Sequence, residues 1–237
     1  MSAKPCLVLL PGLDGSGELF FPLLPLLEPD FDVRVVHYRD EIGFEDYVAT
    51  AEHALPTDAP VSLVAESFSG PIAIRLLADA RFQFMPSVLS ATFCCSPLPW
   101  LTGLGKRLPA RLFRDNVLSR KVLDLLISGR GADTAVRRKS HELLRSVGPE
   151  RFHSRLSLLD NLDLCHRIAD IDVPMLYIQA RRDRVVPARC ASAIASSARE
   201  MTLARVDGPH MILQSRPAEC AALIRQHVMQ SPLSSSR

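Results

Sequence analysis

Short apolar runs alternate with longer segments of helical periodicity along most of the chain. An apolar run of strand length is typical of a strand buried on both faces, and apolar positions three and four residues apart are typical of a helix packed on a sheet. Regular alternation of the two predicts an α/β fold, a parallel sheet with helices on both faces. The predicted strands are 5–10, 32–38, 60–65, 87–95, 173–179 and 200–206, and the predicted helices are 18–28, 44–55, 69–80, 187–198 and 215–229.

One stretch breaks the alternation, because the distance from Ser96 to Val173 is too long for a single crossover helix. Its apolar residues recur at helical spacing, so we expect several helices there. The division predicted is a core of residues 1–97 and 166–237 with a helical cap insertion at 98–165, whose crossover helix lies near 155–168. The apolar positions concerned are Leu112, Val117, Leu118, Val122, Leu125, Leu126, Leu143, Leu144, Val147, Leu156, Leu158 and Leu159.

Composition indicates an ordinary α/β enzyme. With 237 residues and 47% hydrophobic content the chain can bury a full core. The longest apolar runs fall short of the roughly 18 residues of a membrane helix, and the N-terminal run is too short for a signal peptide. The cysteines lack metal-site spacing, so we expect reduced buried thiols, no metal, no cofactor and a cytoplasmic location. The cysteines are Cys6, Cys94, Cys95, Cys165, Cys190 and Cys220.

The charge is unevenly distributed along the chain. Residues 97–170 hold 14 Lys and Arg against 8 Asp and Glu, a net charge of +6, so the rest of the chain carries −4 within a total of +2. A solvated helix face explains this excess, and so does a basic lid that attracts an anionic substrate or an acidic carrier. The cluster Arg137, Arg138 and Lys139 is the densest part of it. The overall charge gives no reason to expect nucleic acid.

The strand predicted at 60–65 ends at a serine, and a helical pattern begins within three residues of it. Such a strand-to-helix turn is typical of a nucleophile elbow, which exposes the serine hydroxyl at the end of the strand. The elbow needs small residues two before and two after the serine, and Ala65 and Ser69 stand at those positions around Ser67. The motif is a degenerate form of Gly-x-Ser-x-Gly, and Ser67 is the predicted nucleophile.

Asp183 and His210 each follow a later strand, in the chain order Ser, Asp, His. A serine hydroxyl needs a base to become a good nucleophile, and the base needs a carboxylate that fixes its tautomer. Side chains beyond the carboxyl ends of parallel strands can meet in one crevice. We therefore predict a catalytic triad of Ser67, Asp183 and His210. Asp172 and Asp207 are the alternative acids.

With these motifs the chain resembles the α/β-hydrolase superfamily over nearly its whole length. Pro11-Gly12-Leu13 stands after the first strand, where members usually have His-Gly-x. The resemblance implies that the backbone N–H groups of Leu13 and Phe68 form an oxyanion hole. The glycines of this loop lack the spacing of a nucleotide site. Members usually open with an antiparallel hairpin; only four residues precede Pro5 here, so we expect six strands, all parallel.

The resemblance is to small esterases of the superfamily, including the type that releases a methyl ester from a pimeloyl group on acyl carrier protein. It implies a serine hydrolase that cleaves a carboxylic ester or thioester through an acyl-Ser67 intermediate. An acyltransferase with the same chemistry, and a ligand-binding member without catalysis, are the alternatives. The sequence leaves the oligomeric state open.

Two features of the expected pocket stay open at this stage. Cap residues Trp100, Leu101 and Leu104 are predicted to line the substrate pocket, although no spacing rule gives its width. Glu66, directly before the nucleophile, either tunes this pocket or hydrogen-bonds to neighbouring backbone.

Overall fold

The chain folds around one six-stranded sheet whose neighbouring strands all pair in parallel, in the order β2-β1-β3-β4-β5-β6. The structure is a computed structural model that describes residues 4–97, 116–129 and 133–230. The predicted six-stranded parallel α/β sheet is confirmed. Its strands are β1 (Cys6–Leu10), β2 (Asp32–Val35), β3 (Val61–Glu66), β4 (Ser87–Ser90), β5 (Met175–Ala180) and β6 (Met201–Val206).

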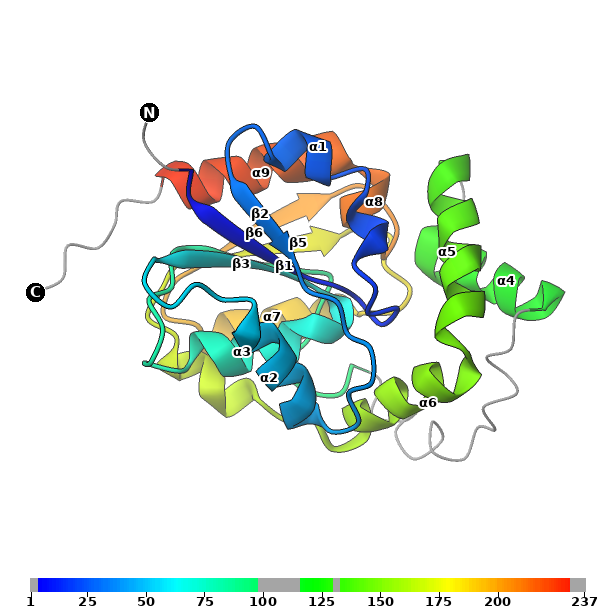
Figure 1. Ribbon diagram of the computed structural model, residues 1–237, viewed down its shortest axis with the longest axis horizontal. Helices are drawn as coiled ribbons and strands as arrows, with labels where there is room; N and C mark the ends of the chain where they lie inside the picture. The colour runs from blue at the N-terminus through cyan, green and yellow to red at the C-terminus, as the bar shows by residue number, and fades with distance from the viewer. Residues whose placement is uncertain (1–3, 98–115, 130–132, 231–237) are drawn as a thin grey trace, which may run out of the picture.

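Helices cover both faces of the sheet (Figure 1). Alternate residues of β1 divide between two cores: Leu7 and Leu9 pack in one, and Val8 and Leu10 in the other. Continuous burial of β1 explains why its sequence is uniformly apolar rather than alternating; β3 is buried throughout as well, with the polar Ser62 and Glu66 in its sequence. One face carries α1 (Leu24–Leu27), α8 (Ile212–Ser215) and α9 (Pro217–Gln230), and the other carries α2 (Phe44–His53), α3 (Gly70–Leu77) and α7 (Ala188–Ser197).

Prolines explain two differences from the predicted helices. The helix expected at 18–28 is divided into a 3₁₀ turn, η1 (Glu18–Phe20), and the short α1, because Pro22 and Pro25 cannot supply interior N–H donors. The helix expected at 215–229 begins two residues later as α9, because Pro217 occupies its first turn, and the separate short helix α8 precedes it.

The strand predicted at 87–95 is too long, because the chain leaves the sheet after Ser90. The following residues pair with a later segment instead: Cys95 bridges Asp163 in antiparallel fashion, and Leu164 N donates to Cys94 O at 2.8 Å. This pairing brings Cys94 to Cys165, 71 residues away, and the two form a disulfide. The expectation of reduced thiols is therefore wrong for this pair, which no local pattern could have shown.

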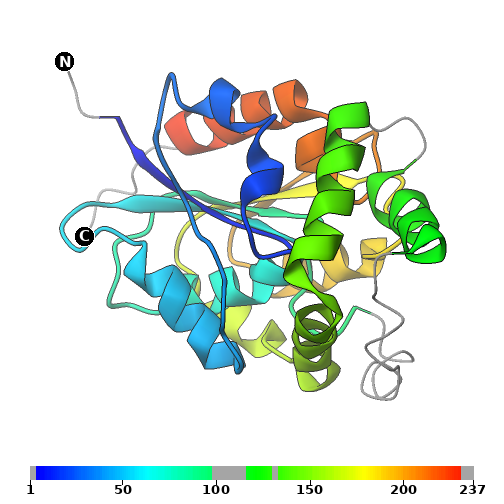
Figure 2. The ribbon, with the colours of Figure 1, turned by 45° about the vertical axis from the view of Figure 1, so that its right-hand side comes forward.

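The described part of the segment between these paired stretches is helical and lies beyond the carboxyl ends of the strands (Figures 1 and 2). A crossover helix at 155–168 is wrong, because α6 ends at Leu158 and only 3₁₀ turns follow. The helices are α4 (Val117–Leu123), the π-helical η4 (Asp124–Ser128), α5 (Thr134–Val147) and α6 (Pro149–Leu158), then the 3₁₀ helices η5 (Leu159–Asn161) and η6 (Cys165–Asp170).

Ion pairs join these helices to the rest of the chain. Lys139 of α5 pairs with Glu18, and Arg151 of α6 approaches Asp40 to 2.5 Å. The excess positive charge of residues 97–170 is thus partly opposed by acids of the core. Arg137, the neighbour of Lys139 in the predicted basic cluster, lies 3.9 Å from Asp124. Among the described residues, no helix is long and apolar enough to cross a membrane.

Candidate active site

Ser67 stands on a strained turn directly after β3. Its φ of 49° is a left-handed value that residues with a side chain rarely adopt. The 3₁₀ helix η2 (Ser67–Ser69) begins there and leads into α3. The turn is held by Thr92, whose hydroxyl donates to the Ser67 carbonyl at 2.5 Å and leaves no space for a side chain at Gly70. The sequence prediction of a tight strand-to-helix turn at Ser67 agrees with this geometry.

His210 lies between Ser67 and Asp183. Its Nε2 is 2.9 Å from Ser67 Oγ, and its Nδ1 is 2.8 Å from Asp183 Oδ2. The other carboxylate oxygen, Oδ1, accepts hydrogen bonds from the N–H groups of Val185 and Val186 at 2.7 and 2.8 Å. The histidine and aspartate side chains are only 7% and 5% exposed. The structure therefore brings the three predicted residues into one continuous hydrogen-bonded chain.

The two alternative acids are engaged elsewhere on the surface. Asp207 forms an ion pair with Arg182 at 3.0 Å, and Asp172 pairs with Arg199. Both carboxylates are well exposed, and neither makes a hydrogen bond to His210. Asp183 is consequently the acid whose position suits the histidine.

The loop after β1 runs beside the serine. An ideal Cβ on Gly12 would lie 3.9 Å from the Ser67 Cβ, so the loop and the elbow are in close approach. Within the described residues, the N–H groups of Leu13 and Phe68, the predicted oxyanion-hole donors, have no hydrogen-bond acceptor. Two free donors flanking a serine are the arrangement that stabilises a tetrahedral oxyanion.

A mostly apolar cavity of about 80 Å³ opens over Ser67 and His210. Trp100, Leu101 and Leu104, the predicted pocket residues, lie outside the described residues. Sequence analysis missed that Phe152 of α6 and Leu123 and Ile127 before α5 would line the cavity. None of the three was among the apolar positions that predicted helices in this segment, and helical spacing alone does not show which face points to the serine. The remaining lining residues are Gly12, Leu13, Asp14, Leu19, Glu66, Ser140, Leu143, Leu144 and Met211.

Glu66 is buried at the wall of this cavity and bonds to a side chain rather than to backbone. Gln214 Nε2 donates to Glu66 Oε2 at 3.0 Å, while the Gln214 Oε1 atom is buried without a hydrogen-bond partner among the described residues. Burial raises the pKa of Glu66 to about 7, although the Gln214 hydrogen bond opposes the rise. Burial of this carboxyl therefore favours its neutral, protonated form.

This raised pKa predicts a loss of stability with rising pH. Between pH 4.5 and 7 the folded state keeps the Glu66 proton while the unfolded state releases it, so deprotonation favours unfolding. Glu66→Gln removes that titration. From pH 4.5 to 8, the free energy of unfolding of this variant should gain about 3 kcal/mol relative to the wild type, measured by urea denaturation. The exposed Glu219→Gln variant is the control, and parallel pH curves for Glu66→Gln and wild type would contradict the assignment.

A group of cysteines lies away from this site. Cys94, Cys95 and Cys165 have sulfur atoms within 4.8 Å of one another, and they are the one group of three or more possible metal ligands found in the part of the chain described here. Two of them are joined as a disulfide.

Comparison with known proteins agrees with this fold. The family model described as "Alpha/beta hydrolase family" matches residues 7–223. A pimeloyl-[acyl-carrier protein] methyl ester esterase from Xanthomonas oryzae pv. oryzae is 26% identical over 223 residues, covering 84% of this chain and 86% of that protein.

Solved structures with the same fold are more distant in sequence. MenH from S. aureus superposes with a TM-score of 0.81 at 14% identity, covering 97% of this chain and 95% of that one. A thermophilic esterase from Thermogutta terrifontis gives a TM-score of 0.81 at 15% identity, with 97% and 91% covered. At these identities the likeness concerns the fold alone.

Proposed function

The chain belongs to the alpha/beta hydrolase family, and from that premise we propose that it hydrolyses a carboxylic ester or thioester through an acyl intermediate on Ser67. The observation that carries the proposal is the hydrogen-bonded chain from Ser67 through His210 to Asp183, set on a strained turn at the floor of a mostly apolar cavity. Each member suits one role of the Ser-His-Asp mechanism.

In the acylation step, Ser67 Oγ attacks the carbonyl carbon while His210 Nε2 takes the hydroxyl proton. Asp183 holds the Nδ1–H tautomer and stabilises the imidazolium that forms. The N–H groups of Leu13 and Phe68 stabilise the oxyanion. His210 then protonates the leaving alcohol or thiol as the carbon–oxygen or carbon–sulfur bond breaks. In the second step His210 deprotonates water, which attacks the acyl group and releases the acid and Ser67.

The substrate class follows from the cavity and from the relatives. The lining side chains supplied by α4 to α6 are largely apolar, which suits an acyl chain better than a sugar or a phosphate. The Xanthomonas relatives are named for a methyl ester carried by acyl carrier protein. We extend the proposal to an acyl group presented by an acidic carrier, with the exposed basic residues of the inserted helices as its docking surface.

A salt titration on two substrates tests both parts of this proposal. The carrier-linked ester should lose about tenfold in kcat/KM between 0.1 M and 1 M salt, because the Debye length falls from about 10 Å to about 3 Å. A p-nitrophenyl ester of the same acyl group should change less than twofold. The exposed Arg138, which has no ion pair among the described residues, is the residue to neutralise. Arg138→Gln should lower kcat/KM for the carrier-linked ester at low salt. Lys4→Gln is the control, because it removes the same charge near the start of β1, away from the carboxyl ends of the strands where Ser67 lies.

The outcomes separate the alternatives. An equal salt response for the two esters, or none for either, would contradict the carrier while leaving hydrolysis intact. Release of the acyl group onto an added alcohol or amine in preference to water would indicate an acyltransferase. Binding of either ester without turnover would indicate a ligand-binding protein and overturn the proposed function.

A further inference from the structure

Arg155 of α6 is a fully buried cation with no acidic partner. It is 1% exposed, and none of the described carboxylates lies within ion-pair distance of it. A buried charge without a counterion is expensive unless its hydrogen bonds are satisfied. Arg155 meets that condition with neutral acceptors: Leu13 O at 2.9 Å, Asp14 O at 2.6 Å, Tyr38 O at 3.3 Å and the Tyr47 hydroxyl at 3.1 Å.

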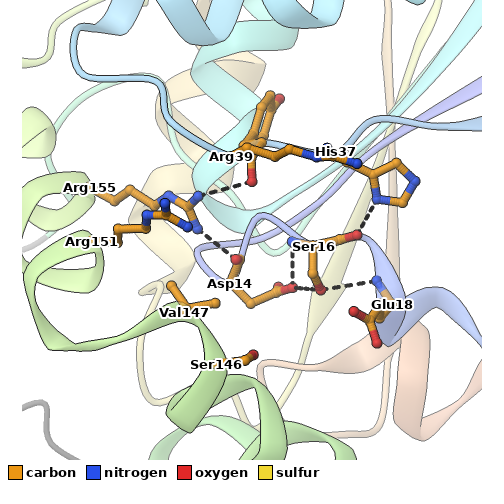
Figure 3. A pocket seen from close by; sticks show the side chains of 10 residues that line it. Asp14, Ser16, Glu18, His37, Arg39, Ser146, Val147, Arg151 and Arg155 are labelled. Atoms are coloured by element: carbon orange, nitrogen blue, oxygen red, sulfur yellow. Dashed lines mark hydrogen bonds between the residues drawn. The ribbon is translucent and has the colours of Figure 1, made fainter.

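The loop after β1 is shaped around this guanidinium group (Figure 3). A side chain at Gly15 would place its Cβ 2.5 Å from Arg155 Nη1, and Gly15 has a φ of +69°. Glycine is therefore required there on both counts. A lysine could not replace the arginine, because one ammonium group cannot reach two loop carbonyls and Tyr47 together. The glycine at position 15 therefore leaves room for the Arg155 guanidinium group, and it is not a sign of a phosphate-binding loop.

The hydrogen bonds of the loop lead from Arg155 to the Leu13 N–H. The two carbonyls that Arg155 binds belong to consecutive peptides, which fixes the orientation of the segment from Leu13 to Gly15. Gly15 N in turn donates to Gly12 O at 3.0 Å and closes the turn. In a trans peptide the C=O and the following N–H point in opposite directions, so fixing Gly12 O also directs the Leu13 N–H.

We infer that Arg155 is a positioning residue that aims the Leu13 N–H at the oxyanion and so makes the oxyanion hole depend on helix α6. This inference rests on the proposed function. Removal of one oxyanion donor typically lowers kcat by about 10²–10³-fold. Without Arg155 the Leu13 N–H is still present but is no longer held toward the oxyanion. We therefore expect kcat to fall by about 10²-fold, with KM little changed.

The test compares a trifluoromethyl ketone, which forms a tetrahedral adduct with a reactive serine, with the methyl ketone of the same acyl chain, which mimics bound substrate. Arg155→Ala and Arg155→Lys should each weaken the trifluoromethyl ketone at least tenfold more than the methyl ketone. Arg151→Ala is the matched control, because Arg151 lies one turn earlier on α6, is half exposed and, among the described residues, bonds only to Asp40. It should leave the ratio of the two affinities within twofold of the wild type.

Three results decide the matter. The positioning role is supported if the affinity for the trifluoromethyl ketone falls relative to that for the methyl ketone in the Arg155 variants, and if added ethylguanidinium partly restores this ratio in Arg155→Ala. An unchanged ratio in folded Arg155→Lys overturns it, even if Arg155→Ala fails to fold. A wild-type protein that forms no adduct at all overturns the proposed function, and this inference with it.

Discussion

Replacing Ser67 with alanine is expected to lower kcat for ester hydrolysis by about 10⁶-fold, the largest effect of any single substitution in this chain. The reason is that His210 then has no hydroxyl to deprotonate, and loss of the nucleophile alone removes nearly all of a triad's contribution. Folding should be almost unaffected, because in the described part of the chain the hydroxyl bonds only to His210, and alanine keeps the Cβ. The measurements are kcat with a p-nitrophenyl ester, labelling by a fluorophosphonate probe, and thermal unfolding.

Ser69 provides the matched control two residues away. Its hydroxyl is fully buried and donates to the Pro11 carbonyl, with Tyr38 as a second neighbour, so its role is structural. Ser69→Ala should keep both labelling and turnover while the protein loses about 1 kcal/mol of stability. Labelling at Ser69, or persistent turnover in Ser67→Ala, would place the nucleophile elsewhere.

The site residues that could be predicted from the sequence are those that local sequence patterns indicate. Ser67 follows directly on β3, Asp183 and His210 lie within four residues of the ends of β5 and β6, and the carboxyl ends of parallel strands lie along one edge of the sheet. The order of strands and helices is therefore enough to bring the three side chains together. The same reasoning predicted the small residues around Ser67, because a tight turn limits its own neighbours.

The features that sequence analysis missed depend on distant contacts. Arg155 reads as one more cation in a basic segment, and only the fold shows that it is buried against the loop after β1. Cys94 and Cys165 are joined through an antiparallel contact between two segments 71 residues apart, and no local pattern pairs these segments. Glu66 is similar, since Gln214 lies 148 positions away. In each case the partner is fixed by tertiary packing, which hydrophobic periodicity does not specify.

The helix boundaries could be predicted only in part from the sequence. Pro22 and Pro25 were visible as helix breakers, yet the apolar spacing around them was strong enough to suggest one continuous helix at 18–28. The structure keeps the apolar contacts and interrupts the backbone hydrogen bonds, so periodicity predicted burial correctly and helix length incorrectly.

Replacing Asp183 with asparagine is expected to lower kcat by about 10⁴-fold without unfolding the protein. The N–H groups of Val185 and Val186 both donate to Oδ1, so the asparagine must keep its carbonyl oxygen there and turn its NH₂ group toward His210. That group can only donate, so His210 Nδ1 must become an acceptor and Nε2 must carry the proton. An Nε2–H facing Ser67 Oγ cannot take the serine's proton.

The control and a double mutant make this prediction specific to the triad. Asp207→Asn removes a surface ion pair with Arg182 and should leave kcat within about twofold. Loss of activity there, with full activity in Asp183→Asn, would reassign the acid. In the Ser67→Ala background, Asp183→Asn should cost almost nothing further, since residues that act as a unit are strongly non-additive. Additive losses in the double mutant would mean that Asp183 supports the fold of the site rather than the base at His210.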